Sequence, residues 1–254
     1  MLVICPGGTI LNSGYYAACA GLKAQTEALE LVANNLANLS TSGYRGQQAT
    51  FHSLLSGYTG ASATALNRAI NDYNVLGDTR TDLVAGSLAP TGNPLDLAIE
   101  GEGFFPVQTS AGLRYTRNGN FRTSAKNQLT TAAGDLVMGS QGPITVPAGA
   151  LSISADGTIS VEGAVAGKLR IVEFVPGTSP LSEGLGLYSS SGAAPQDATA
   201  SYVRQGMLES SNVNPVLATV SLMSVQRHFE MLQGALSAYY NTFNRIAAED
   251  LPRI

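Results

Sequence analysis

Apolar residues recur at heptad spacing through the last part of the chain. Between Ala218 and Ile246 the steps alternate between four and three residues without interruption, which is the spacing of a coiled-coil seam. Asn214 followed by Pro215 is typical of a helix start, because asparagine caps the first turn and proline fits its first position. We therefore predict a helix that begins at Pro215 and stops before Pro252, on the order of 50 Å long. The seam comprises Ala218, Leu222, Val225, Phe229, Leu232, Leu236, Tyr239, Phe243 and Ile246.

A second heptad pattern lies near the N-terminus. It stops at Ser40-Thr41-Ser42-Gly43, where hydroxyl side chains compete for backbone hydrogen bonds and glycine tolerates a positive φ. We predict a helix followed by a turn, with the two terminal helices paired as a coiled coil. The alternative is an ordinary α+β domain whose end helices pack on its own sheet. The N-terminal seam comprises Leu22, Gln25, Leu29, Val32, Leu36 and Leu39.

The middle of the chain has a different pattern. From Leu95 onward, short alternating or apolar runs are separated by Gly, Asn, Asp and Pro every 8 to 12 residues, which is typical of many short strands. Asn118-Gly119 and Asp156-Gly157 are favourable dipeptides for tight hairpin turns. The runs are LDLAIE, FFPVQT, LRYT, NFRTS, DLVMG, ITVP, LSIS, TISVE and KLRIVEFV.

These patterns together predict an α+β protein in which long terminal heptad helices form a coiled-coil domain and the centre is all β. We expect four segments in chain order. They are an N-terminal helical segment at 12–55, a linker or extension at 56–94, a central β domain at 95–204 and a C-terminal coiled-coil helix at 205–254. The first of these is expected to pair with the last.

Composition narrows the possible functions. The chain has 14 Lys and Arg against 18 Asp and Glu, with a net charge of −4, which argues against nucleic acid as the main partner. Runs of about 18 apolar residues, as a membrane-spanning helix needs, do not occur in the sequence. Cys5 and Cys19 cannot form a disulfide framework, and His52 and His228 cannot by themselves form a metal site. Low charge with many small residues suits a chain that is buried against neighbours.

Candidate chemistry is weak throughout. Gly101-Glu102-Gly103 is not followed by the third glycine and helix of a nucleotide site, and the serines lie in no nucleophile-elbow pattern. Asp96, Glu100 and Glu102 alternate along one predicted strand, but acidic residues at strand ends are usually solvated. We therefore expect no enzyme activity, catalytic residue, cofactor, metal or small-molecule substrate.

Three amides cluster near the end of the N-terminal helix, at Asn34, Asn35 and Asn38. One interpretation is a frayed and capped helix terminus. The other is that these amides bond to the backbone of a neighbouring chain. The residues alone leave the two equally supported.

Three separated segments resemble one protein family. GLKAQTEALELVANNLANLSTSGYRGQQATF (21–51) is similar to the N-terminal signature of the flagellar rod, hook and hook–filament junction proteins. TGNPLDLAIEGEGFFPVQTSAGLRYTRNGNF (91–121) resembles the start of the β domain of the rod and hook members, and GMLESSNVNPVLATVSLMSVQRHFE (206–230) resembles the C-terminal segment. Length and the β-domain start resemble the rod members more than the longer hook member, with the proximal form favoured over the distal form.

The resemblance implies a structural subunit of the bacterial flagellar basal-body rod, polymerised through its terminal helices and transmitting torque to the hook. Implied partners are further copies of the chain, other rod and hook proteins and the flagellar export apparatus, with export that uses no cleaved signal peptide. A distal rod or hook-type protein is one alternative, and a secreted β-domain binding module is another. The residues expected at assembly interfaces are Leu22, Leu29, Asn34, Asn35, Leu36, Asn38, Gly43, Arg45, Glu209, Asn212, Asn214, Leu222, Val225, Arg227, Phe229, Glu230, Leu232, Leu236, Tyr239 and Phe243.

The first ten residues have no counterpart in the family pattern. They contain Pro6, Gly7 and Gly8, which disfavour any backward extension of the helix. We expect the working chain to begin at Leu11, read as an initiator; the alternative is a genuine extension that helps the exporter recognise the chain.

Overall fold

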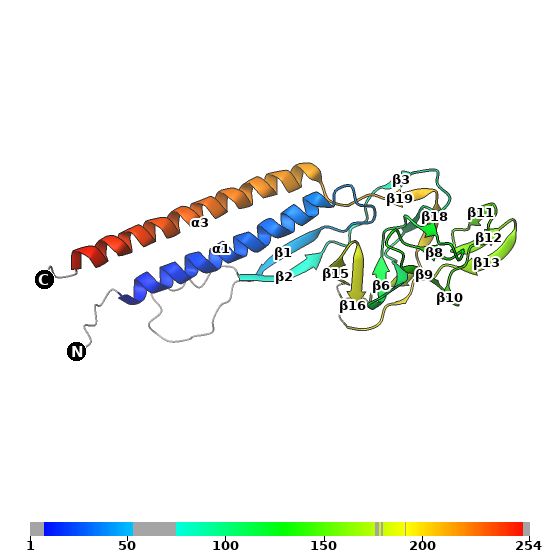
Figure 1. Cartoon of the computed structure of the whole chain (residues 1–254), viewed down its shortest axis with the longest axis horizontal. Helices are drawn as coiled ribbons and strands as arrows, with labels where there is room; N and C mark the ends of the chain where they lie inside the picture. The colour runs from blue at the N-terminus through cyan, green and yellow to red at the C-terminus, as the bar shows by residue number, and fades with distance from the viewer. Residues whose placement is uncertain (1–7, 53–74, 176–177, 179, 191, 251–254) are drawn as a thin grey trace. The chain divides into compact units, whose positions relative to one another are not determined.

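The computed structural model describes residues 8–52, 75–175, 178, 180–190 and 192–250. It consists mainly of β strands, with one helix at each end of this part of the chain (Figure 1). The chain divides into two compact units. The first contains 1–34, 48–79 and 216–254, and the second contains 35–47 and 80–215.

Helix α1 (Gly8–Ala37) is the N-terminal helix of the first unit. Its start at Gly8 corrects the expectation that residues 1–10 would be non-helical; Pro6 and Gly7 lie outside the described residues. The helix ends where the Ser/Thr/Gly cluster predicted a turn, and Gly43 has a φ of 69°.

The buried face of α1 differs from the predicted seam. The fully buried residues are Gly21, Ala24, Ala28 and Leu31, whereas Leu22 and Leu29 are only half-buried. A stripe of small residues therefore forms the most enclosed line of the helix, one position before the larger aliphatic residues. Small side chains permit a neighbouring element to approach closely, which leaves the larger ones flanking the contact.

Helix α3 (Pro215–Asp250) begins at the predicted proline and ends before Pro252. Its 36 residues span about 54 Å at the rise of an α-helix. One heptad stripe is half-buried and matches the predicted seam as far as the structure describes the side chains. Its members are Ala218, Leu222, Val225, Phe229, Leu232 and Leu236. The side chains of Tyr239 and Phe243 lie outside the description, and the coiled-coil pairing itself stays a prediction.

A two-stranded sheet of β1 (Gln47–His52) and β2 (Val75–Thr81) lies mostly in the first unit. The sequence patterns did not predict either strand. β2 lies at the end of the segment expected to be a linker, most of which (53–74) lies outside the described residues.

The second unit is built around an eight-stranded antiparallel sheet, in which seven strands follow one path and β10 pairs with β9 alone. In path order the strands are β15 (Pro180–Gly184), β16 (Leu187–Ser190), β6 (Gly112–Thr116), β5 (Phe105–Thr109), β9 (Leu136–Gly139), β8 (Leu129–Thr130) and β7 (Arg122–Thr123), with β10 at Gly142–Pro143. Alternate residues of these short strands face one core, which includes Leu97, Phe105, Val107, Phe121, Leu129 and Val137.

Smaller antiparallel sheets complete this unit (Figure 1). They are β11 (Leu151–Ile153), β12 (Thr158–Val161) and β13 (Ala164–Lys168); β14 (Val172–Glu173) with β17 (Gln196–Asp197); β4 (Leu97–Glu100) with β18 (Tyr202–Gln205); and β3 (Leu88–Pro90) with β19 (Met207–Glu209). In the last two sheets, the segment before α3 returns to pair with strands from the start of the unit.

The two predicted hairpin turns have different outcomes. Asp156-Gly157 does join β11 to β12, with Gly157 at a φ of 82°. Asn118-Gly119 does not make a hairpin, because β6 pairs with β5 and not with the strand that follows it. Gly119 instead accepts a hydrogen bond from the Leu97 N–H at 3.0 Å. A Cβ atom at Gly119 would overlap the Leu97 carbonyl oxygen, so glycine is required there by close backbone approach.

The run ITVP (144–147) was also predicted as a strand, and this prediction is wrong. Only Thr145 makes an isolated bridge, to Gln128, while Ile144 and Val146 are buried in the core. The alternating apolar residues here are buried side chains of a connecting segment, which forms no ladder of strand hydrogen bonds.

Gly119→Ala should therefore destabilise the second unit strongly. The new methyl group would have to displace the backbone of β4, and we expect a loss of more than about 2 kcal/mol in the free energy of unfolding. Urea denaturation followed by circular dichroism measures the loss. Gly167→Ala is the matched control, because a Cβ atom there meets open space, and equal stability of the two variants would contradict the close approach.

Candidate functional site

The segment that follows α1 makes a left-handed turn at Gly43. The Gly43 N–H donates a hydrogen bond to the Glu209 carbonyl oxygen at 2.7 Å. A Cβ atom at Gly43 would collide with the backbone of Arg117 and Asn118. Glycine is required here by both its φ of 69° and its surroundings. The result is that residues from three distant parts of the sequence meet at one place.

Three charged side chains form the centre of this site, which we call the ion triad: Arg45, Arg117 and Glu209. Arg45 Nη2 lies 2.8 Å from Glu209 Oε1, and Arg117 Nη1 lies 3.2 Å from Glu209 Oε2. Each of the three side chains is only 1% exposed. One carboxylate thus bridges two guanidinium groups inside the protein.

The ion triad carries a net charge of +1, and backbone carbonyl groups compensate the excess. Arg45 Nη1 donates to the carbonyl oxygens of Leu83, at 3.0 Å, and Val84. Arg117 donates to the carbonyl oxygens of Ile99, at 3.1 Å, and Gly101. Removing two guanidinium groups from water is costly, and such hydrogen bonds to charged donors recover part of that cost.

Two further contacts surround the ion triad. The Gly86 N–H donates to Glu209 Oε1 at 2.9 Å, and the Arg117 guanidinium lies 5.2 Å from the centroid of the Phe104 ring, within the range of a cation–π interaction. Burial lowers the pKa of Arg117 to about 10, although the charge of Glu209 raises it in part. Arg117 therefore stays protonated at neutral pH.

Two asparagine side chains extend the site as backbone clamps. Asn35 donates to the Gln47 carbonyl oxygen at 2.8 Å and accepts from the Gln47 N–H and the Tyr44 hydroxyl, both at 2.9 Å. Asn212 accepts from the Gly46 N–H at 2.7 Å and donates to the carbonyl oxygens of Asp82 and Val84. For Asn35, these contacts favour an amide that bonds to backbone, but within its own chain.

Tyr188 closes the site from β16, the strand next to the edge strand β15 of the large sheet. Its hydroxyl oxygen accepts a hydrogen bond from the Arg45 N–H at 3.2 Å. Burial raises the pKa of Tyr188 to about 12, and burial also raises the pKa of Tyr44. Both phenols are therefore neutral under ordinary conditions.

The predicted interface residues separate into two groups. Gly43, Arg45, Glu209 and Asn212 are brought together with Asn35 at the ion triad and have partners within the chain. The remaining polar residues do not join it: Arg227 and Glu230 are exposed on α3, Asn34 and Asn214 are exposed, and Asn38 is half-buried and accepts a hydrogen bond from Thr41.

Two members of the site were not singled out from the sequence. Arg117 lies in the segment 91–121 that resembles the family, and its position between a strand end and an Asn-Gly pair was the available signal. Tyr188 carried no recognisable signal. Asp96, expected to be solvated, is instead 4% exposed and accepts hydrogen bonds from the Asn93 and Asn120 amides.

The site has the chemistry of a structural junction. Among the described residues, His, Cys, Asp and Glu side chains do not gather in groups of three or more that could hold a metal ion. In the same residues, no helix is long and apolar enough to cross a membrane.

Three family models match the chain in sequence order. Flagella basal body rod protein matches residues 16–45, the flagellar hook protein FlgE/F/G D1 domain matches 98–161, and the flagellar basal body rod FlgEFG protein C-terminal matches 204–248. Each matched segment supplies one member of the ion triad: Arg45, Arg117 and Glu209, respectively. These matches define an axial protein of the bacterial flagellum.

Relatives that match nearly the full length of the chain are also flagellar rod proteins. The chain is 33% identical over 239 residues to the flagellar basal-body rod protein FlgF of Caulobacter vibrioides, covering 89% of this chain and 92% of the relative. It is 32% identical to FlgF of Salmonella typhimurium (87% and 91% covered) and 33% identical to FlgG of Agrobacterium fabrum (84% and 90% covered). The chain belongs to the flagellar basal-body rod protein family.

Membership of this family confirms the resemblance found in the sequence. The chain is a structural subunit of the flagellar rod and not an enzyme, it is located in the flagellar basal body, and it assembles with other rod and hook proteins.

Glu209→Gln should be the most damaging single change at the ion triad. It leaves two buried guanidinium groups facing one another without a counter-charge, and we expect a loss of about 3–5 kcal/mol in the free energy of unfolding. Glu183→Gln is the control, because Glu183 pairs with Arg114 at 2.5 Å on the surface, where such pairs contribute less than about 1 kcal/mol. Chemical denaturation of both variants measures the difference, and equal losses would show that the ion triad contributes no more than a surface pair.

Tyr188 should make the stability of the protein sensitive to alkaline pH. A phenol titrates near 10 when unfolded, and burial raises the pKa of Tyr188 to about 12. The folded state therefore binds the proton more tightly. The contribution of Tyr188 to the free energy of unfolding is complete below pH 10 and is lost as the pH rises through 12. The loss is about 2–3 kcal/mol.

The comparison of wild type with Tyr188→Phe isolates this effect. Arg117, with its pKa lowered to about 10, acts in the opposite direction at high pH, but it is present in both proteins and cancels. Denaturation at pH 8 to 12 measures the difference in free energy of unfolding between wild type and Tyr188→Phe. This difference should be constant up to pH 10 and should fall above it. A difference independent of pH would mean that Tyr188 is not buried as a neutral phenol.

Proposed function

We propose that the chain occupies the proximal rod and polymerises through α1 and α3, which pair as a coiled coil with their counterparts in neighbouring copies and in other rod proteins. The half-buried heptad stripe of α3 supports this proposal, together with the apolar residues on its other faces. Val216, Leu217, Val220, Met223, Met231 and Tyr240 are each at least 54% exposed in the single chain. A helix that is apolar on more than one face requires more than one partner.

The proposed mechanism assigns different tasks to the segments. Residues 12–55 and 205–254 form the polymerising coiled coil, 95–204 form the β domain, and 56–94 connect the two. The contacts between copies are made by Leu22, Leu29 and Leu36 of α1 and by the predicted interface residues from Leu222 to Phe243 of α3. The flagellar export apparatus is the partner that delivers the chain, while nucleic acid and small-molecule substrates take no part.

The ion triad supports torque transmission in this mechanism. Arg45 lies eight residues after the end of α1 at Ala37, and Glu209 lies six residues before the start of α3 at Pro215. The segments that lead into both terminal helices are thus held by one buried ion pair. A rotating shaft needs these segments to resist local unfolding, because force on the helices enters the second unit through them.

Leu236→Asp tests the polymerising seam. A charge placed in an apolar helix contact costs several kcal/mol unless it stays solvated, about 3–5 kcal/mol for an uncompensated buried charge. We expect the β domain to keep its near-ultraviolet circular dichroism while the chain no longer enters isolated basal bodies. Ser237→Asp is the control, because Ser237 is exposed on the same helix. If Leu236→Asp supports rod assembly and motility as well as Ser237→Asp does, the seam is not an interface.

A further inference from the structure

The hairpin of β15 and β16 ends in an unfavourable turn. Gly184 pairs with Leu187, so that Leu185 and Gly186 form a two-residue turn. Their φ angles are 54° and 72°, the signature of a type I′ turn, which favours Asn-Gly. A leucine at positive φ is rare, because its Cβ atom approaches the backbone too closely.

The same leucine is also the most exposed of the large apolar residues in the described part of the chain. Leu185 is 89% exposed. An apolar side chain held in water on a strained backbone contributes nothing to the stability of the monomer. Strain of this kind persists where the surroundings enforce it, and it is concentrated at functional positions.

The surroundings of the turn do hold it rigidly. The Thr116 hydroxyl donates to the Gly186 carbonyl oxygen at 2.8 Å, and Arg114 pairs with Glu183 at 2.5 Å. Tyr188, two residues beyond the turn, is anchored at the ion triad. Leu185 is therefore presented as a fixed apolar knob, with little entropy left to lose on binding.

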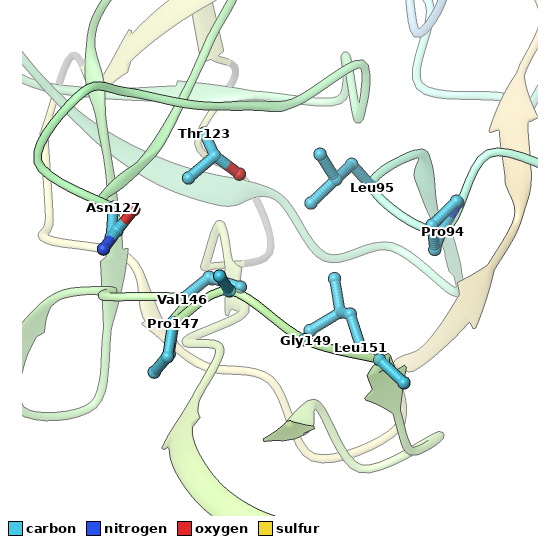
Figure 2. A pocket seen from close by; sticks show the side chains of 10 residues that line it. Pro94, Leu95, Thr123, Asn127, Val146, Pro147, Gly149 and Leu151 are labelled. Atoms are coloured by element: carbon cyan, nitrogen blue, oxygen red, sulfur yellow. The ribbon is translucent and has the colours of Figure 1, made fainter. Parts of the chain in front are cut away.

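At the other edge of the large sheet lies an apolar groove of about 560 Å³. Figure 2 shows the side chains of Leu95, Val146 and Leu151 around this space, with Thr123 and Asn127 at its margin. None of the ten side chains drawn is charged. Such a lining suits an aliphatic ligand and does not suit a charged one.

The groove is also preformed. Gln205 Nε2 donates to the carbonyl oxygens of Pro94, at 2.9 Å, and Leu151, at 3.2 Å, which belong to its two walls. The Val146 N–H donates to the Asn127 carbonyl oxygen at 2.6 Å. Knob and groove are both rigid before any contact forms.

The knob and groove cannot meet within one chain. The sheet order places β15 at one edge and β7, which carries Thr123, at the other. Six strand spacings separate these edges, roughly 29 Å at the usual spacing. A contact between two different surfaces of one molecule is heterologous, and repetition of it produces a ring or an open helical polymer.

We propose that the Leu185 turn of one copy docks into the Leu95–Val146–Leu151 groove of a second copy, as a head-to-tail contact between β domains. This contact rests on the proposed function, since it is one of the bonds that would hold neighbouring subunits in the rod. Its occupant is a second copy because the chain itself presents a rigid apolar knob that has no role in the monomer, together with an uncharged groove able to receive it.

Leu185→Asn separates the two effects of the knob, because asparagine suits the turn and does not suit the groove. The variant should raise the thermal unfolding midpoint of the monomer and also raise the concentration needed for self-association. The concentration needed for self-association should rise about ten- to one-hundredfold, as expected for the loss of one buried leucine. Sedimentation velocity over a concentration series measures association. Leu113→Asn is the matched control, a partly exposed leucine of the same sheet at ordinary φ.

Each outcome has a clear meaning. If Leu185→Asn associates at the same concentration as wild type, the docking contact is overturned while polymerisation through the helices stands. If the wild-type full-length chain does not self-associate at all, the polymerising function fails and the contact fails with it. If Leu113→Asn weakens association equally, a polar side chain weakens association wherever it is placed on this sheet, and the specific contact is overturned.

Cross-linking tests the geometry directly. Ala148 also lines the groove. The full-length chain with Leu185→Cys and Ala148→Cys, in a Cys5→Ser and Cys19→Ser background, should form a ladder of dimers, trimers and longer products on oxidation during assembly. Either single-cysteine variant should form no ladder, whereas an equal mixture of the two should give dimers only. Products no longer than those of the single-cysteine variants would overturn head-to-tail docking.

Discussion

The charge of Glu209 is the constraint on which the rest of the second unit depends. A carboxylate that is 1% exposed must have its charge met at short range. Here that requires Arg45 from the N-terminal segment and Arg117, which directly follows β6, the second strand of the first hairpin of the large sheet. The carbonyl oxygens that accept hydrogen bonds from the Nη atoms of the two arginines then fix the paths of residues 83–84 and 99–101. One buried anion thereby sets the relative positions of five chain segments.

Close backbone approach makes this burial possible. Gly43, Gly86 and Gly119 each lie where a Cβ atom would meet another backbone, and each is near a member of the site or the strand beside it. The ion triad is therefore as much a product of glycine as of charge. Each of the three separated segments that the family models match supplies one charged group to this single cluster.

Much of the fold followed from the sequence because its signals are local. Heptad spacing and the Asn214-Pro215 cap predicted α3, and Asp156-Gly157 predicted the hairpin of β11 and β12. Strands β16, β18 and β19 were missed because they pair with β6, β4 and β3, which lie far earlier in the chain. β15 pairs with the adjacent β16 and was missed because its own patterning is weak. The buried line of α1 was placed one residue late, since alanine gave a smaller signal than leucine although it permits closer packing.

The site could be predicted only in part from the sequence, because its residues meet through contacts between distant segments. Arg45, Glu209 and Asn212 were chosen through a family resemblance that attributes them to assembly, and nothing in their spacing indicates that they meet. Arg117 and Tyr188 became visible only when the sheet brought them to Arg45. Leu185 also gave no signal in the sequence. Its unfavourable position in a turn at positive φ can be recognised only when its φ and its exposure are both known.

Hydrogen exchange at single amides tests the central account most directly. The N–H groups of Gly43, Gly46 and Gly86 donate to Glu209 or Asn212 at the ion triad, outside any regular strand. If the buried charges hold this junction, these amides should exchange as slowly as that of Phe104, which bonds to Val172 in the β core. Rapid exchange of all three, with Phe104 still protected, would show that the junction opens independently and that the ion triad does not hold the terminal segments.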